Sequence, residues 1–289
     1  MPLSNDVIIN VENLSFKYKN SVKPALFNIN FSVKPGEFIL VAGPSGCGKS
    51  TLCRALNGLI PHFYTGDMEG RVTIKGLDTR ETPTHVLARH IGMVFQNPEN
   101  QLFLSSVEKE LAFGPENLGL PKDVIKDRVE EIIDLLDLES IRDKPPYELS
   151  GGQQQKVAIG AVLTMKPEIL VLDEPTANLD PASAEEIMNI ICKLNRDLGL
   201  TVLLVEHRLD IITPMCTKVF IMMGGRFIAA GKPREILASL NMKDVGVDIP
   251  KVIMAFKALR SKGIALRDVP LTPEEFAMLV KGRLYELRH

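Results

Sequence analysis

The chain carries, over residues 38–51, the stretch Phe38-Ile39-Leu40-Val41-Ala42-Gly43-Pro44-Ser45-Gly46-Cys47-Gly48-Lys49-Ser50-Thr51. Its first five residues are a continuous apolar run, which is typical of a strand covered on both faces of a sheet. The remainder fits the pattern G-x-x-x-x-G-K-[ST], a glycine-rich turn that joins a strand to a helix. The stretch therefore predicts a strand over 38–42, a phosphate-binding loop (P-loop) after it, and a helix from Lys49 to about Leu56.

The residue types of this loop suit a nucleoside triphosphate. Glycines let the backbone curl so that its N–H groups point at phosphate oxygens, and the positive end of the following helix adds to the attraction. Lys49 supplies a positive charge to the β- and γ-phosphates, and the Ser50 hydroxyl is placed to bind Mg²⁺. The alternative, a merely tight turn, leaves a complete motif in its strand–turn–helix context unexplained. Expected contacts come from the whole loop: Gly43, Pro44, Ser45, Gly46, Cys47, Gly48, Lys49, Ser50 and Thr51.

A P-loop alone is compatible with kinases, GTPases and ATPases, so a second stretch of sequence is needed to choose among these classes. Ile169-Leu170-Val171-Leu172-Asp173-Glu174 reads as a buried strand that ends in two carboxylates. Such carboxylates lie at the edge of the sheet where α/β folds bind ligands. Asp173 is expected to hold Mg²⁺, directly or through water, and Glu174 to polarise the attacking water. A carboxylate pair at a strand end is common on protein surfaces, but after a P-loop it favours nucleotide hydrolysis.

Outside these two stretches, strand-like runs alternate with helix-like segments. Residues 7–42 and 71–95 have the pattern of short strands with one short helix, and residues 121–137 place apolar residues at helical spacing. This alternation predicts an α/β fold around a largely parallel sheet. Further strands are expected at 91–95, 169–172, 201–205 and 219–223, further helices from near Ser150 and over 183–198, and short helical pieces from about Leu240 to the end.

Composition narrows the function classes. The 289 residues are 45% hydrophobic and 24% charged, with a net charge of −2, so the global basic bias of a nucleic-acid or anionic-membrane binder is absent. The sequence has no apolar run of about 18 residues and no secretory pattern at its start. Cys47, Cys53, Cys192 and Cys216 form no metal-type pair, which indicates a reducing cytosol. Any work at a membrane is therefore expected to need a partner.

A third motif lies shortly before the strand that ends in Asp173. It reads Leu149-Ser150-Gly151-Gly152-Gln153, where Ser150 is a natural helix N-cap and the glycines permit close backbone approach. The helix that follows presents a second positive end to an anion. Both helix ends are unlikely to reach one triphosphate within a single chain, whereas a head-to-tail pair of chains would allow it. The alternative is an ordinary Ser-capped helix.

Together these motifs resemble the ATP-binding cassette (ABC) ATPase family over residues 7–235. Tyr18 matches the aromatic residue that stacks on adenine, Gln96 the Q-loop glutamine, Asn178-Leu179-Asp180 the D-loop, and His207 the switch histidine that contacts the γ-phosphate. The resemblance implies an antiparallel β subdomain and a helical signature subdomain beside the parallel sheet. It implies the catalytic residues Glu174, Gln96 and His207, the Mg²⁺ ligands Ser50, Gln96 and Asp173, and the further ATP contacts Tyr18, Ser150, Gly151, Gly152, Gln153 and Asp180.

Three positions depart from the family pattern. Lys156 stands where many members have Arg, Asn178 where Gly or Ala is commoner, and Glu206 where Thr is frequent. None of these changes removes a catalytic group. The sequence therefore predicts an active ATPase.

Within this family the chain is similar to the energy-coupling-factor (ECF) ATPases, which power uptake of vitamins and of cobalt or nickel ions. The similarity rests on 96–103, 107–117, 231–237 and the tail 262–275. It implies a cassette of residues 1–240, with a helical subdomain at about 97–165, and a C-terminal dimerisation appendage of 241–289. It also implies partners: a second ATPase chain, an integral membrane coupling subunit seated near residues 96–117, and a substrate-binding membrane subunit. The chain would then lie at the cytoplasmic face of the cell membrane as a peripheral protein.

Two alternatives stay open. One is the ATPase of a conventional binding-protein-dependent importer, and the other a cassette acting on nucleic acid or ribosomes, against which the balanced charge and the short spacing from P-loop to signature weigh. The transported solute and the choice between homodimer and heterodimer are not readable from this chain. Cys47, beside Lys49 and a helix N-terminus, is expected to have a lowered thiol pKa, so that maleimide inhibits the enzyme and MgATP protects it. The alternative is a small residue that fills the loop.

Overall fold

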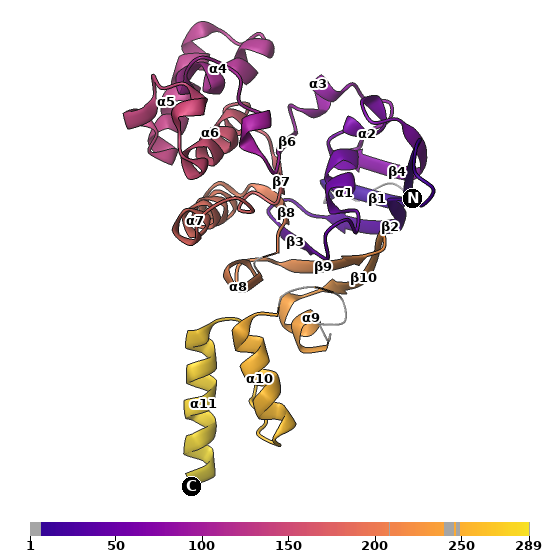
Figure 1. The fold of residues 1–289 in the computed structure, drawn as a ribbon, viewed down its shortest axis with the longest axis vertical. Helices are drawn as coiled ribbons and strands as arrows, with labels where there is room; N and C mark the ends of the chain where they lie inside the picture. Colours follow the sequence, from indigo (N-terminus) through magenta and orange to yellow (C-terminus); the bar gives the residue numbers. More distant parts are fainter. Residues whose placement is uncertain (1–6, 208, 240–245, 247–248, 289) are drawn as a thin grey trace.

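Two β-sheets and a set of helices make up the molecule (Figure 1). The computed structural model describes residues 7–207, 209–239, 246 and 249–288. The start of the chain and the boundary predicted near Leu240 lie outside the described residues.

The larger sheet has six strands. Every neighbouring pair is parallel except β9 and β10, which confirms the expected α/β fold around a largely parallel sheet. Across the sheet the order is β10 (Arg226–Gly231), β9 (Lys218–Met223), β3 (Phe38–Ala42), β8 (Thr201–Val205), β7 (Ile169–Asp173) and β6 (Ile91–Val94).

The central strands β3, β8 and β7 are almost wholly apolar because both of their faces are covered. Phe38 and Leu40 of β3 face one core, shared with the helices after residue 107, whereas Ile39 and Val41 face a second core, shared with the smaller sheet. All five residues of β3 are buried. The predictions of strands at 38–42 and 201–205 are confirmed to the residue.

The smaller sheet is antiparallel, as the family resemblance implied. Its order is β2 (Leu26–Val33), β1 (Ile9–Tyr18), β4 (Gly66–Ile74) and β5 (Leu77–Asp78), and the helices α1 (Lys49–Leu56), α2 (Leu59–His62) and α3 (Thr84–Leu87) connect it to the larger sheet. Strand β4 begins five residues earlier than the predicted 71. Its first half alternates exposed and half-buried residues and is held by pairing with the far end of β1, where Tyr18 lies opposite Gly66.

A group of three helices packs on one side of the larger sheet: α4 (Val107–Asn117), α5 (Lys122–Leu136) and α6 (Gly151–Leu163) (Figure 1). Helix α5 confirms the segment predicted at 121–137. Helix α4 was not predicted, because Gly114 and Pro115 inside it argue against a helix. The short 3₁₀ turns Pro98–Asn100, Glu139–Ile141 and Pro146–Glu148 connect this group.

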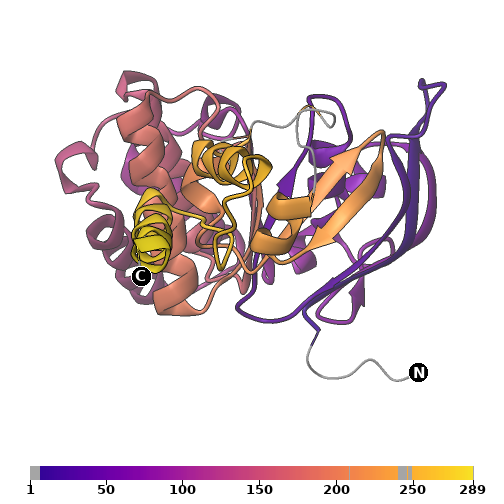
Figure 2. The same cartoon turned by 90° about the horizontal axis from the view of Figure 1, so that it is seen from below.

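The remaining helices follow strands β7 to β10 along the chain. Helix α7 (Pro181–Leu198) begins two residues before the predicted start, because Asp180 caps it. After α8 (Leu209–Ile212) and α9 (Pro233–Ser239), the helices α10 (Lys251–Ser261) and α11 (Pro273–Arg288) project away from both sheets (Figure 1), and α11 is seen end-on in Figure 2. None of the described helices is both long enough and apolar enough to cross a membrane. The division into a cassette and a C-terminal appendage stays a prediction.

Candidate functional site

The site lies at the carboxyl edge of the larger sheet. Parallel pairing brings the ends of four strands side by side, with Val41 beside Val205, Val205 beside Asp173, and Leu172 beside Val94. The P-loop follows β3, Glu206 and His207 follow β8, Glu174 follows β7, and Gln96 lies two residues after β6. Motifs scattered over more than 160 residues of sequence therefore meet at one edge.

The P-loop is shaped by glycines at places that tolerate no side chain. A Cβ on Gly43 would lie 2.1 Å from the Met222 carbonyl oxygen, and Gly48 has a φ of 113° with its missing Cβ 2.4 Å from the Ala25 carbonyl oxygen. Gly48 is the N-cap of α1 and provides no side-chain cap, so the first N–H groups of this helix stay open to an anion.

Lys49 is held inside this loop. Its residue is 4% exposed, and its Nζ donates to the carbonyl oxygens of Gly43 at 2.9 Å and Pro44 at 3.1 Å. The same Nζ lies 3.6 Å from Glu174 Oε1. A buried ammonium group tethered in this way is pre-positioned for phosphate oxygens.

Glu174 is the centre of the cluster. Its Oε1 is 2.9 Å from His207 Nε2, and its Oε2 accepts a hydrogen bond of 3.0 Å from Gln96 Nε2. The backbone of Glu174 is left-handed, with a φ of 51°, and its N–H donates to the Val205 carbonyl oxygen at 2.9 Å. A non-glycine residue held there is strained by about 1 kcal/mol or more, which is common at functional sites. The structure thus joins all three residues predicted to be catalytic.

Ser50 and Asp173 form the predicted metal-binding pair. Ser50 Oγ donates to Asp173 Oδ1 at 3.1 Å. Burial raises the pKa of the Asp173 carboxyl, the Ser50 hydrogen bond lowers it, and the charge of Glu174 raises it again. Within the described chain no three His, Cys, Asp or Glu side chains gather as a metal site. The pair therefore fits a Mg²⁺ ion whose other ligands come from phosphates and water, because Mg²⁺ usually binds one or two carboxylates and keeps several waters.

Tyr18 lies beside α1. Its hydroxyl is 3.2 Å from Thr51 Oγ1 and accepts a hydrogen bond of 3.2 Å from Arg54 Nη1, while its ring packs edge-on against Phe16. The guanidinium of Arg54 in turn lies over the Tyr64 ring, 4.5 Å from its centroid. Sequence reasoning missed Arg54, since a single basic residue inside a helix carries no motif. Adenine stacking by Tyr18 stays a prediction.

The signature residues are not brought to the P-loop. Ser150 and Gln153 form a capping box at the start of α6, which confirms the predicted N-cap. Gly151 and Gly152 instead approach Leu179 and Ser183, which belong to the region of the predicted D-loop. Among the described residues, no hydrogen bond or ion pair joins Ser150–Gln153 to the P-loop of the same chain.

Asp180 caps a helix within its own chain. Its carboxylate accepts from the N–H groups of Ala182 and Ser183 and from the Ser183 hydroxyl, the last at 2.5 Å. Hydrogen bonds from Ser183 lower the pKa of Asp180. A contact to nucleotide, as the resemblance implied for Asp180, stays a prediction.

The expectation of a lowered thiol pKa at Cys47 is wrong. Cys47 is buried, and burial raises its pKa by more than the charge of Lys49 and the loop N–H groups lower it. The sequence showed the cation and the helix end but not the burial. The physical reason for a reactive thiolate is therefore absent, and the structure favours the alternative of a residue that fills the loop.

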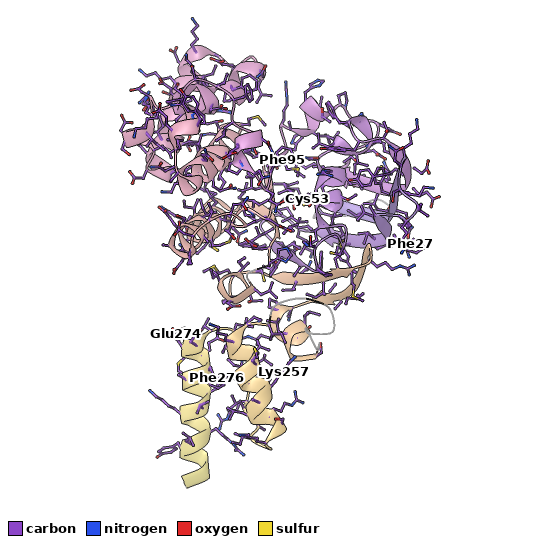
Figure 3. The ribbon with its side chains drawn as sticks, in the orientation of Figure 1. Phe27, Cys53, Phe95, Lys257, Glu274 and Phe276 are labelled. Atoms are coloured by element: carbon purple, nitrogen blue, oxygen red, sulfur yellow. The ribbon has the colours of Figure 1, made fainter. Side chains whose placement is uncertain are left out.

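A groove of about 430 Å³ opens between the α4–α6 helices and the elements around α1 and α3. Phe95 lies between these two parts (Figure 3), and Phe103 and Phe113 pack edge to face at 5.1 Å between ring centroids. Phe103 is 65% exposed. The buried carboxylate of Glu110 accepts the backbone N–H groups of Phe103 and Leu104, which fixes the loop that presents this ring.

The carboxyl edge of the larger sheet thus holds a P-loop, a carboxylate pair and His207 after adjacent parallel strands. The chain also matches known proteins. The family model for ABC transporters matches residues 26–177. A relative named "Putative ABC transporter ATP-binding protein" from Pyrococcus abyssi is 42% identical over 95% of this chain and 98% of its own length. The chain belongs to the ABC transporter family and is an ATP-binding, ATP-hydrolysing member of it.

Solved structures agree with this assignment. The cbiO1 protein of Clostridium perfringens, described as part of the ABC transporter complex cbiONQ, is 36% identical, with a TM-score of 0.73 over 87% of this chain and 99% of that one. A dimeric ATP-binding cassette bound to ADP and Pi is 30% identical, with a TM-score of 0.69 over 78% of this chain and 99% of that one.

Some relatives are much longer than the matched region. A relative from Methanosarcina mazei is 45% identical over 87% of this chain, which spans only 43% of that protein.

Proposed function

We propose that this chain is the ATP-hydrolysing subunit of an ECF-type importer, working as a dimer on separate membrane subunits to take up a vitamin or a cobalt or nickel ion. The observation that carries the proposal is the cluster in which Glu174 contacts Lys49, Gln96 and His207 at one sheet edge. These groups sit where the γ-phosphate of an ATP in the P-loop and its attacking water would meet.

In the hydrolysis step these residues position the attacking water and neutralise charge on the phosphates. Water polarised by Glu174 attacks the γ-phosphorus in line, the bond from phosphorus to the β–γ bridging oxygen breaks, and ADP and phosphate result. Lys49 stabilises charge on the β- and γ-phosphates, and His207 contacts the γ-phosphate. Gln96 orients the water. Positioning and charge stabilisation are the main protein contributions to phosphoryl transfer.

Mg²⁺ would be held by Ser50 and Asp173, with the amide oxygen of Gln96 as a third protein ligand. When bound, the ion supplies neutralisation of charge on the β- and γ-phosphate oxygens. The raised pKa of Asp173 supports this assignment, because a carboxylate that is costly to ionise in a buried place gains from a nearby cation.

A second chain would complete each site. The signature residues Ser150–Gln153 do not reach the P-loop of their own chain, and a head-to-tail dimer would place them on the nucleotide of the partner. The similar cassette solved as a dimer with ADP and Pi supports this arrangement. The helices α10 and α11, which project from the body, would add dimer contacts.

The groove beside α4 would receive a helix of the membrane coupling subunit, which would hold the chain at the cytoplasmic face of the membrane. An exposed aromatic pair, Phe103 on a fixed loop and Phe113 on α4, offers the apolar contact that such a helix needs. Similarity to cbiO1, part of the cbiONQ complex, supports the ECF type over a conventional importer.

The test is ATP hydrolysis by Glu174→Gln in the assembled transporter. We expect loss of hydrolysis with retained ATP binding, and a wild-type rate would show that the assignment of Glu174 is wrong. In the same system Phe103→Asp should separate ATPase from membrane subunits while the isolated chain still binds ATP. Hydrolysis stimulated by RNA rather than by membrane subunits would instead favour a cassette that acts on nucleic acid.

A further inference from the structure

Hydrogen bonds of side chains join the three loops around Glu174 into a circuit of two rings, which share the loop 174–179. On one side Gln96 donates to Glu174, and its neighbour Asn97 accepts a bond of 2.8 Å from Asn178 Nδ2. On the other side His207 contacts Glu174 through Nε2.

The second half of the circuit runs through a buried carboxylate. Glu206, 2% exposed, accepts the His207 backbone N–H at 2.7 Å through Oε2 and the Thr176 hydroxyl through Oε1. Thr176 is also buried and belongs to the same loop as Asn178. The loop 174–179 is therefore bonded at one end to the residue beside Gln96 and at the other, through Glu206, to His207.

Two side chains provide the links between these loops. Asn178 donates to Asn97, and the Glu206 carboxylate accepts from the Thr176 hydroxyl and from the His207 N–H. Ala at position 178 would have no side-chain donor for Asn97, and Thr at position 206 would be two atoms too short to take the place of the carboxylate. Each side chain therefore provides one of the two links that tie the loop 174–179 to the loops of Gln96 and His207.

We propose that Asn178 and Glu206 are positioning residues, which tie the loop 174–179 to its two neighbours so that Gln96 and His207 are held on Glu174 as one unit. This inference rests on the proposed role of Glu174 in hydrolysis. Neither residue touches the P-loop among the described contacts, so they act on the rate of hydrolysis and not on ATP affinity.

The experiment measures phosphate release by the full-length chain in the assembled transporter for Asn178→Ala, Glu206→Thr and the double variant. We expect Asn178→Ala to lower kcat about fivefold, the effect of losing one hydrogen bond, and Glu206→Thr, which removes two, to lower it by at least as much, both with an unchanged KM for ATP. The kcat of the double variant should fall by less than the product of the two single losses, since both links hold groups on the same carboxylate of Glu174. Glu206→Gln should stay close to wild type, because its amide can accept from His207 N–H and donate to the Thr176 hydroxyl.

Controls separate this inference from a structural effect and from the proposed function. Asn189→Ala removes an exposed asparagine of α7 and should leave kcat unchanged. Asn178 is exposed, so its variant tests the circuit even where Glu206→Thr lowers the thermal midpoint. A wild-type kcat in both single variants, a raised KM, or multiplicative losses in the double variant would overturn the inference. An inactive Glu174→Gln beside such results would leave the proposed function standing, whereas an active Glu174→Gln would overturn the proposed function itself.

Discussion

Helices α1 and α6 both begin in glycine-rich motifs, but their N-termini are opposite in character. The first turn of α1 has Gly48 as its N-cap, no side-chain cap and a buried Lys49 beside it. The start of α6 is exposed and bonds two of its own donors, since Ser150 Oγ accepts from Gln153 N–H and Gln153 Oε1 accepts from Ser150 N–H. The first helix end thus has a cation and no side-chain cap, whereas the second has a side-chain cap and no buried cation.

The two glycine-rich motifs are therefore suited to different parts of nucleotide binding. An uncapped helix end next to a buried cation gains the most from a phosphate group, so α1 is suited to be the primary nucleotide site. A self-capped end gains less, because two of its N–H groups are already bonded within the chain. Helix α6 is thus suited to a nucleotide that is first bound elsewhere, as in a head-to-tail dimer.

The largest expected effect comes from removing the charge that sets α1 apart. Lys49→Ala should lower ATP hydrolysis about 100-fold or more, because the variant loses the buried cation proposed to stabilise charge on the β- and γ-phosphates. The measurement is phosphate release together with calorimetric MgATP binding. The matched control is Lys156→Ala in α6, which breaks an ion pair with Glu186 at 2.5 Å and should leave ATP binding by the single chain unchanged. Equal losses in both variants would contradict the contrast between the two helices.

A smaller effect is expected from breaking the cap of α6. Ser150→Ala should reduce MgATP-driven dimerisation, measured by analytical ultracentrifugation, about tenfold, and stability by about 1 kcal/mol. Ser106→Ala removes a serine cap from α4 with the same 3.4 Å hydrogen bond. It should cost a similar amount of stability without changing dimerisation. Should both variants dimerise equally well, Ser150 has no role beyond its own helix.

Asp173→Asn should stabilise the nucleotide-free protein. The pKa of Asp173 is raised in the fold, so its ionised form opposes folding increasingly as the pH rises through that pKa. We expect a thermal midpoint about 2 °C higher at pH 7, with the gain shrinking as the pH falls toward 4. Asp180→Asn should do the reverse, because capping bonds lower the pKa of that carboxyl. A lower midpoint for Asp173→Asn would show that the carboxylate is compensated by its surroundings.

The smallest effect concerns Cys47 in the loop before α1. Since burial raises the pKa of this thiol, maleimide should label it at pH 7 about tenfold more slowly in the native chain than in the unfolded one. Mass spectrometry of the labelled peptide gives both rates. Rapid native labelling would mean that Lys49 and the open helix end stabilise the thiolate after all.

Much of the fold could be predicted because its strands carry an unambiguous pattern. The buried strand 38–42 is apolar throughout, the strand 201–205 is apolar after Thr201, and the two are followed by Gly43 and Glu206, so even their bounds were predicted. Helix α4 was missed because Gly114 and Pro115 lie inside it, and the start of β4 because its first half has no buried side chain. Both are held by contacts with distant segments, which a local pattern does not contain.

For the site, motifs predicted the groups but not the bonds between them. Gln96, Glu174 and His207 were placed from their spacing after strands, and the structure joins them. The bond between Asn97 and Asn178 spans 81 residues of sequence, and the bond between Thr176 and Glu206 spans 30. No sequence pattern predicts either bond. The error at Cys47 has the same origin, because burial of the loop depends on strands that are remote in sequence.

The strand order of the larger sheet gives the site a direction. Neighbouring strands lie about 4.8 Å apart, so the loops after β3, β8, β7 and β6 form a row about 14 Å long. Lys49 follows the first strand of this row, Gln96 follows the last, and Glu174 follows the strand beside the last. Because Glu174 contacts both Lys49 and Gln96, one carboxylate connects the two ends of the row.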